Sequence, residues 1–220
     1  MIVGKQKPLE EIKGMIANYD KVLVLGCDTC VAICFAGGER EAGILASALR
    51  MSEEISGSGK TITEYAIKRQ CEHEFLEELD DKVSEIDAVI SLACGIGVQA
   101  LAERYPDKPI LPGINTVFLG FPDQHGVWSE KCSACGDCVL DQTGGICPVT
   151  RCTKGLLNGP CGGTNNGKCE VDPEKDCAWT LIYQRLEKLG KLDLMRKYYP
   201  PRNFQVVIRP GKITMEEEGT

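Results

Sequence analysis

Apolar positions in the first 120 residues alternate between short continuous runs and stripes at helical spacing. The runs KVLVLG, DAVISLA and PILPGIN, together with the β-rich segment TITEYAIKR, predict strands over 21–26, 87–93, 109–115 and 61–69. Helical spacing predicts helices over 8–19, 37–52, 71–86 and 97–105. Strands that alternate with helices of this length are typical of βαβ units. Residues 1–127 are therefore expected to form a Rossmann-like α/β domain with a parallel sheet.

The pattern changes near Trp128, and a second domain is expected over 128–220. Residues 132–177 contain many glycines and few long apolar side chains, so an ordinary hydrophobic core is not expected there. Helical periodicity resumes over 176–199, and Pro200 and Pro201 end it. The following segment, NFQVVIR at 203–209, is either an exposed strand or part of a tail that docks a partner. We expect a cysteine-rich domain with little regular structure, a C-terminal helix and a docking tail.

Composition and charge narrow the class of protein. Hydrophobic residues make up 43% of the chain and charged residues 26%, as in ordinary globular domains. No apolar run approaches the ~20 residues of a membrane span, and the first residues lack the layout of a signal peptide, so the cytosol is the expected compartment. A net charge of −7 argues against nucleic acid as a partner, because phosphate binding depends on a basic surface.

Thirteen cysteines are the main departure from average composition. A reducing cytosol does not maintain disulfides, whereas thiolates in such number typically bind metal. The alternative, a secreted protein with a disulfide framework, requires a targeting signal that the sequence does not show.

Eight of the cysteines form a block whose spacing is typical of metal clusters. Two successive C-x2-C steps bring several thiolates to one point, and a Cys-Pro pair follows after a gap of eight residues. Bacterial ferredoxins have three residues in that gap, so the ferredoxin fold itself is not implied. Structural zinc is the alternative, since it also takes four cysteines. Eight ligands suit two four-iron clusters, or one cluster and one zinc ion. The predicted ligands are Cys132, Cys135, Cys138, Cys147, Cys152, Cys161, Cys169 and Cys177.

The other five cysteines lie near the predicted strand ends of the first domain. Ligands in an open parallel sheet bind outside the carboxyl ends of the strands, so these thiols are candidates for a third metal site. The alternative is that they are small buried apolar residues. The five are Cys27, Cys30, Cys34, Cys71 and Cys94.

The segment GIGVQA at 95–100 matches a dinucleotide-binding fingerprint between a strand and a helix. The acidic residue expected after the next strand is missing, and Cys94 lies where a phosphate would approach. An enzyme that holds a nucleotide here is a further alternative. The sequence shows no nucleophile with its base, no P-loop and no paired carboxylates, so no catalytic residue is predicted.

The stretch GGICPVTRCTKGLLNGPCGGTNNGKCEVDPEKDCAW at 144–179, with the upstream CSACGDC, resembles the cysteine-rich C-terminal domain of MetV proteins. These are the small subunits of methylenetetrahydrofolate reductase in acetogenic and related bacteria. LGCDTCVAICFAGGERE and LACGIGVQ are similar to the N-terminal half of the same family.

The resemblance implies an iron-sulfur subunit that holds [4Fe-4S] clusters on the cysteines named above. The number of cysteines suits two or three clusters, with zinc as an option at one site. It also implies a MetF-type flavoprotein partner, whose flavin reduces 5,10-methylenetetrahydrofolate to the 5-methyl form, and a further electron-donor subunit or ferredoxin. This chain would relay electrons without binding folate. A zinc-stabilised module that only anchors the catalytic subunit is the competing interpretation.

Overall fold

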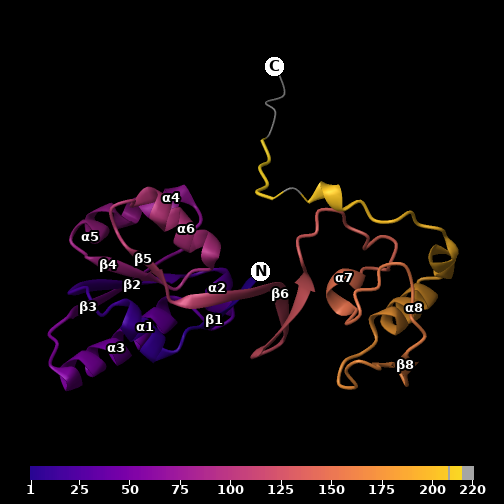
Figure 1. Cartoon of the computed structure of the whole chain (residues 1–220), viewed down its shortest axis with the longest axis horizontal. Coiled ribbons are helices and arrows are strands. Elements are labelled where there is room, and N and C mark those ends of the chain that lie inside the picture. The colour runs from indigo at the N-terminus through magenta and orange to yellow at the C-terminus, as the bar shows by residue number, and fades with distance from the viewer. Residues whose placement is uncertain (208, 215–220) are drawn as a thin grey trace, which may run out of the picture. The chain divides into compact units, whose positions relative to one another are not determined.

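The structure is a computed structural model that describes residues 1–207 and 209–214. The chain forms two compact units, Met1–Ser129 and Glu130–Thr220, which are described separately (Figure 1). None of the described helices has the length and apolar character that a membrane crossing requires.

A parallel sheet of four strands forms the centre of the first unit. Its strands are β2 (Lys21–Cys27), β3 (Thr61–Ile67), β4 (Ala88–Ser91) and β5 (Ile110–Pro112), in the order β3-β2-β4-β5. Each neighbouring pair is parallel. The predicted α/β fold with a parallel sheet is confirmed.

Helices cover both faces of this sheet (Figure 1). On one face lie α1 (Leu9–Met15) and α3 (Glu39–Ser56), and on the other α4 (His73–Leu76), the 3-10 turn η1 (Glu77–Leu79), α5 (Asp80–Ser84) and α6 (Gly95–Arg104). Alternate residues of a strand point to opposite faces. In β2, Val24 accordingly packs in one core with Leu49 of α3, while Leu25 packs in the other with Leu101 of α6.

A second sheet of the first unit was not predicted. It contains β1 (Ile2–Gln6), β6 (Ile114–Gln124) and β7 (Val127–Cys132) in the order β1-β6-β7, with β1 antiparallel to β6. The run expected as one strand over 109–115 is divided between β5 and β6 at Gly113. A Cβ atom on Gly113 would lie 2.5 Å from Leu92 Cδ2, so the chain passes too close to β4 there for a larger residue.

The prediction of one helix over 71–86 was wrong, since α4, η1 and α5 occupy this segment in turn. A further short helix, α2 (Cys30–Ile33), follows β2. Both departures concern short, glutamate-rich or cysteine-rich segments where periodicity alone does not fix the boundaries.

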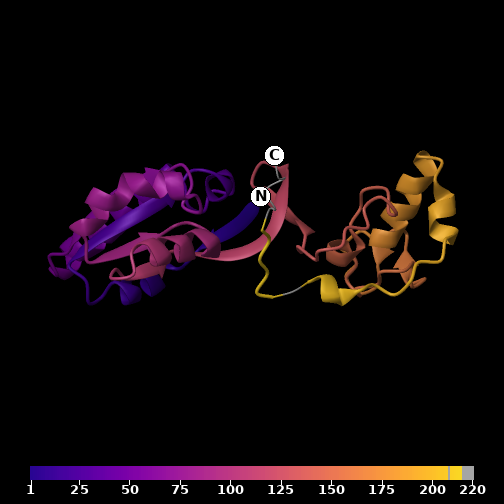
Figure 2. The same ribbon diagram turned by 90° about the horizontal axis from the view of Figure 1, so that it is seen from above.

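The second unit has little regular structure and many cysteines, as expected. Its elements are α7 (Pro148–Arg151), the two-residue strands β8 (Thr164–Asn165) and β9 (Lys168–Cys169), α8 (Ala178–Lys188), and the 3-10 turns η2 (Leu192–Arg196) and η3 (Phe204–Val206). Its buried apolar cluster is small, with Trp179, Ile182 and Leu186 at its centre. Figure 2 shows α8 and η2 side by side in this unit.

Two predictions for the C-terminal segment need correction. The helix expected over 176–199 ends at Lys188, because Gly190 adopts a left-handed conformation with φ 65° and the chain continues as η2. An exposed strand was one of two possibilities for residues 203–209, but residues 204–206 form η3 instead. Ile208 and the last part of the predicted docking tail, residues 215–220, lie outside the described residues.

Candidate metal centres

Three of the N-terminal cysteines lie at neighbouring strand ends of the parallel sheet. Cys27 is the last residue of β2, Cys71 follows β3, and Cys94 follows β4 and precedes α6. Because β2 lies between β3 and β4, all three thiols belong to one edge of the sheet. They lie close enough that Cys94 and Cys27 add to the effect of burial in raising the pKa of Cys71. This edge includes the topological switch point, where open α/β sheets bind ligands.

A buried polar contact that sequence reasoning missed holds this edge together. The side chain of Gln70 is fully buried and donates hydrogen bonds to the carbonyl oxygens of Leu25 (3.0 Å) and Gly26 (2.9 Å) in β2. Its oxygen accepts a hydrogen bond of 2.6 Å from the hydroxyl of Ser91 in β4. Gln70 thus fixes the chain next to Cys71 against the ends of two strands.

Cys30 is the first residue of α2, and Cys34 directly follows the helix. Cys34 is buried, and its sulfur accepts a hydrogen bond of 3.3 Å from the backbone N–H of Gly4 in β1. Burial is the main cause that raises the pKa of Cys34, and the neighbouring Cys30 adds to it. Of the five N-terminal cysteines, Cys34 and the equally buried Cys27 therefore also fit the alternative of a small buried residue.

Four cysteines of the C-terminal block line one small cavity of about 30 Å³. Cys152 follows α7, Cys161 lies in the following loop, Cys169 ends β9, and Cys177 precedes α8. The structure therefore brings together residues that are up to 25 positions apart in sequence (152 to 177). We call these four residues the distal set.

The surroundings of the distal set favour thiolate. A hydrogen bond from the backbone N–H of Val171 is the main cause that lowers the pKa of Cys169. Burial acts to raise the pKa of Cys177, but hydrogen bonds led by Thr180 outweigh it, and that pKa is lowered too. The thiolate is the form that binds metal.

The remaining four cysteines of the block, which we call the proximal set, lie along the segment that joins β7 to α7. Cys132 ends β7, Cys135 and Cys138 follow in the loop, and Cys147 precedes α7. Gly136 has φ +79°, a left-handed conformation that turns the chain between Cys135 and Cys138.

No three histidine, cysteine, aspartate or glutamate side chains within residues 1–207 and 209–214 are arranged as a ready-made ion site. The donor chemistry nevertheless fits a thiolate-bound metal, since four cysteines line one cavity and two of them have lowered pKa values. The thirteen predicted ligands stay a prediction.

The glycine pattern at 95–100 has a packing explanation. The backbone N–H of Gly95, which opens α6, donates a hydrogen bond of 2.8 Å to the hydroxyl of Thr116. A Cβ atom on Gly97 would lie 2.6 Å from Ala93 Cβ and 3.0 Å from Gln70 Cβ. The amide expected to face a phosphate is thus occupied, and Gly97 is accounted for by close packing of α6.

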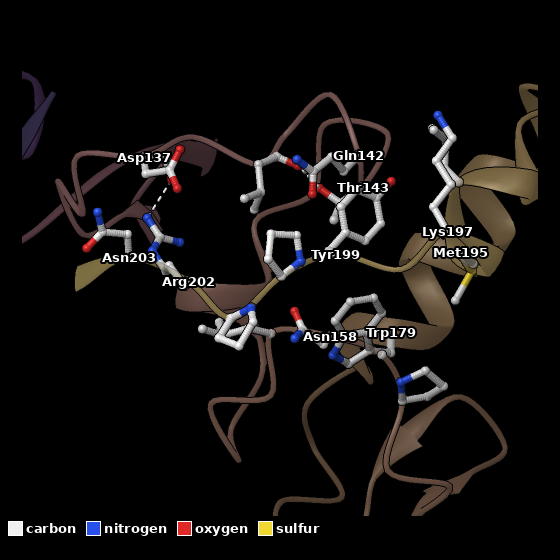
Figure 3. A pocket seen from close by; sticks show the side chains of 17 residues that line it. Asp137, Gln142, Thr143, Asn158, Trp179, Met195, Lys197, Tyr199, Arg202 and Asn203 are labelled. Carbon is white, nitrogen blue, oxygen red and sulfur yellow. Dashed lines mark hydrogen bonds between the residues drawn. The ribbon is translucent and has the colours of Figure 1, made fainter. Parts of the chain in front are cut away.

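A larger pocket of about 380 Å³ adjoins the distal set in the second unit (Figure 3). Trp179 and Pro160 line both this pocket and the thiol cavity. Tyr199 also lines the pocket, and its buried hydroxyl has no hydrogen-bond partner in the described part of the chain. Trp179 uses its indole N–H to bind the carbonyl oxygen of Leu156 at 3.1 Å, so it presents only its ring.

The fold and the thiols define a two-part protein: an open α/β unit with cysteines at its strand ends, and a cysteine-rich unit in which four cysteines line one small cavity. Residues 111–205 match the family model described as "Methylene-tetrahydrofolate reductase C terminal". This match includes all eight cysteines of the block and relates that part of the chain to methylenetetrahydrofolate reductases. Neither a curated protein nor a solved structure matches the chain.

Proposed function

We propose that this chain is the iron-sulfur electron-transfer subunit of a methylenetetrahydrofolate reductase. It relays electrons, one at a time, between a donor such as a ferredoxin and the flavin of a MetF-type subunit, where 5,10-methylenetetrahydrofolate is reduced. The observation that carries the proposal is the distal set, in which four thiols line one cavity within the matched region.

Each set of cysteines has its own place in the proposal. The distal and proximal sets hold one [4Fe-4S] cluster each, and the N-terminal cysteines are candidates for a third. Bound clusters supply one-electron chemistry at potentials from roughly −700 to +450 mV. The chain's own residues hold the sulfurs and donate N–H groups to them.

Backbone hydrogen bonds to sulfur support this role. The sulfur of Cys152 accepts from the N–H of Leu156 at 3.4 Å, and that of Cys161 from the N–H of Gly163 at 3.3 Å. Such donors stabilise the more negative, reduced state of a cluster and so raise its potential. In a purely structural ion site these contacts would only orient the ligands.

Zinc at the distal set is the second candidate, because four cysteines that line one cavity are also the usual ligand set of a structural, tetrahedral zinc ion. A chain with a cluster in the proximal set and zinc in the distal set would still transfer electrons. If the chain bound zinc and no cluster, its only remaining role would be to anchor the catalytic subunit.

The test is anaerobic purification of the full chain, analysis of iron, zinc and sulfide, and EPR spectroscopy of the reduced protein. We expect about eight or more iron atoms per chain, with matching sulfide. When the chain is then mixed anaerobically with the reduced flavoprotein, electrons should pass between flavin and cluster. Absorbance spectroscopy detects this transfer. Iron below about four atoms per chain in anoxic material would contradict the proposal.

Single cysteine substitutions show which metal each of the two sets binds. Cys169→Ser in the distal set and Cys138→Ser in the proximal set should each remove the metal of one centre and leave the other. If the distal set holds zinc, Cys169→Ser lowers zinc and leaves iron unchanged. Equal loss of all metal in both variants would argue against two independent centres.

A further inference from the structure

Arg202 contacts the sulfur of a proximal cysteine directly. Its Nη2 atom lies 2.9 Å from Cys135 Sγ and 3.2 Å from the carbonyl oxygen of Cys135, and it also donates to the carbonyl oxygen of Asp137. Figure 3 shows Arg202 beside Asp137, joined by a dashed line. One guanidinium nitrogen thus binds three acceptors of the loop between Cys135 and Cys138.

The C-terminal segment that carries Arg202 is fixed against the same loop. A Cβ atom on Gly136 would lie 3.2 Å from the carbonyl oxygen of Val206 and 3.4 Å from the side chain of Val207. Asn203, next to Arg202, accepts a hydrogen bond of 2.9 Å from the backbone N–H of Gln205 at the start of η3. The approach of Arg202 to Cys135 is therefore supported by the residues that follow Arg202 and pack against the same loop, not by one long side chain alone.

The hydrogen-bond donor at Cys135 Sγ is positively charged, unlike the donors at several other sulfurs of the block. Cys132, Cys152 and Cys161 accept hydrogen bonds from neutral backbone N–H groups. Lys154 also interacts with Cys161, but its ammonium group is exposed and ion-paired with Glu170. Arg202 is half-buried, so its positive charge is screened less by water.

From this geometry we infer that Arg202 is a positioning residue that raises the reduction potential of the proximal centre. The inference rests on the proposed function. Uptake of one electron adds one negative charge to the centre and its thiolates, and a fixed guanidinium next to Cys135 Sγ stabilises that added charge. Because a guanidinium keeps its proton throughout the working pH range, its effect does not depend on a titration.

The test compares the midpoint potentials of full-length variants. Wild type, Arg202→Gln and Arg202→Lys are purified anaerobically, their iron and sulfide are measured, and each is titrated with dithionite as the electron source while EPR follows the reduced centre. Arg196→Gln is the matched control, because Arg196 is exposed and forms an ion pair with Asp193, at 2.9 Å.

We expect Arg202→Gln to shift the potential of one centre to more negative values at unchanged iron content. Arg202→Lys should recover part of the shift, since lysine keeps the charge but not the planar guanidinium. Arg196→Gln should leave both potentials at the wild-type values. A second centre whose midpoint potential is unchanged in Arg202→Gln would be assigned to the distal set.

Unchanged potentials in iron-loaded Arg202→Gln would overturn the inference and leave the proposed function intact. If Arg202→Gln loses the iron of one centre, retention in Arg202→Lys supports the role of the charge, and equal loss in both variants overturns it. Wild-type protein without iron would overturn the proposed function, and the inference with it.

Discussion

At the scale of single residues, Gln70 shows how a polar side chain can organise a candidate site without being a ligand. It is fully buried, and each of its hydrogen-bonding atoms has a partner in β2 or on Ser91. Buried polar groups with all partners satisfied fix one arrangement of their neighbours, because any other arrangement leaves a group unpaired. Here the fixed neighbour is Cys71.

Gln70→Leu should lower the free energy of unfolding by about 1–3 kcal/mol, because the Gly26 carbonyl and the Ser91 hydroxyl each lose their hydrogen bond to the Gln70 side chain. The Leu25 carbonyl oxygen keeps a partner, the backbone N–H of Leu92 at 2.9 Å. Urea denaturation followed by circular dichroism measures the change. The control is Gln99→Leu, since Gln99 is exposed on α6, and it should stay within about 0.5 kcal/mol of wild type. Equal effects of the two variants would show that the hydrogen bonds of Gln70 add nothing.

At the scale of elements, the parallel sheet could be predicted from sequence because its strands are buried on both faces. β4 is buried at every position, and β2 at all but its first, so each reads as a continuous apolar run. β6 has no such pattern, since most of its residues are exposed or partly exposed. The second sheet, which depends on pairing between β1 and β6 across more than 100 residues, therefore left no local signal.

Of the residues in the candidate sites, only the cysteines could be predicted from the sequence. Cysteine spacing gave the thirteen candidate ligands, but it could not divide the eight-cysteine block, since the distal set is assembled by a loop, a short strand and two helix ends. Gln70 and Arg202 were also missed, because a single glutamine or arginine carries no periodic or spacing signal. Only the fold brings them to the thiols.

The close packing of α6 against the strand ends can be tested with two glycines in helices. Gly97→Ala should destabilise the protein by about 1–3 kcal/mol, because its Cβ atom would overlap Ala93 and crowd Gln70. Gly43→Ala is the matched change in α3, where nothing lies within 4 Å of the added Cβ, and it should stabilise by about 0.5–1 kcal/mol. Thermal or urea denaturation gives both values. Effects of the same sign would refute this packing argument.

At the scale of the whole molecule, the two units differ in what holds them together. The first unit has two large apolar clusters, one on each face of its parallel sheet. In the second unit, Trp179, Ile182 and Leu186 form the centre of a small cluster, and much of the chain around it is loop. Apolar burial at about 25 cal/mol per Å² cannot order so much loop against its conformational entropy, so bound metal is the expected source of cohesion.

Removal of metal should therefore unfold the second unit and spare the first. We expect treatment with a chelator and a thiol reductant to expose residues 130–207 to limited proteolysis, while fragments from 1–129 persist at wild-type rates. Mass spectrometry of the fragments identifies the cut sites, and hydrogen exchange gives an independent measure. The matched control is protein incubated with the same concentration of reductant but without chelator, which separates loss of metal from any effect of the reductant.

Loss of protection in both units at the same rate would mean that the parallel sheet also depends on metal, through the thiols of Cys27, Cys71 and Cys94 at its edge. Protection that persists in both would mean that the small cluster around Trp179 suffices, and that metal in the second unit is not needed for folding.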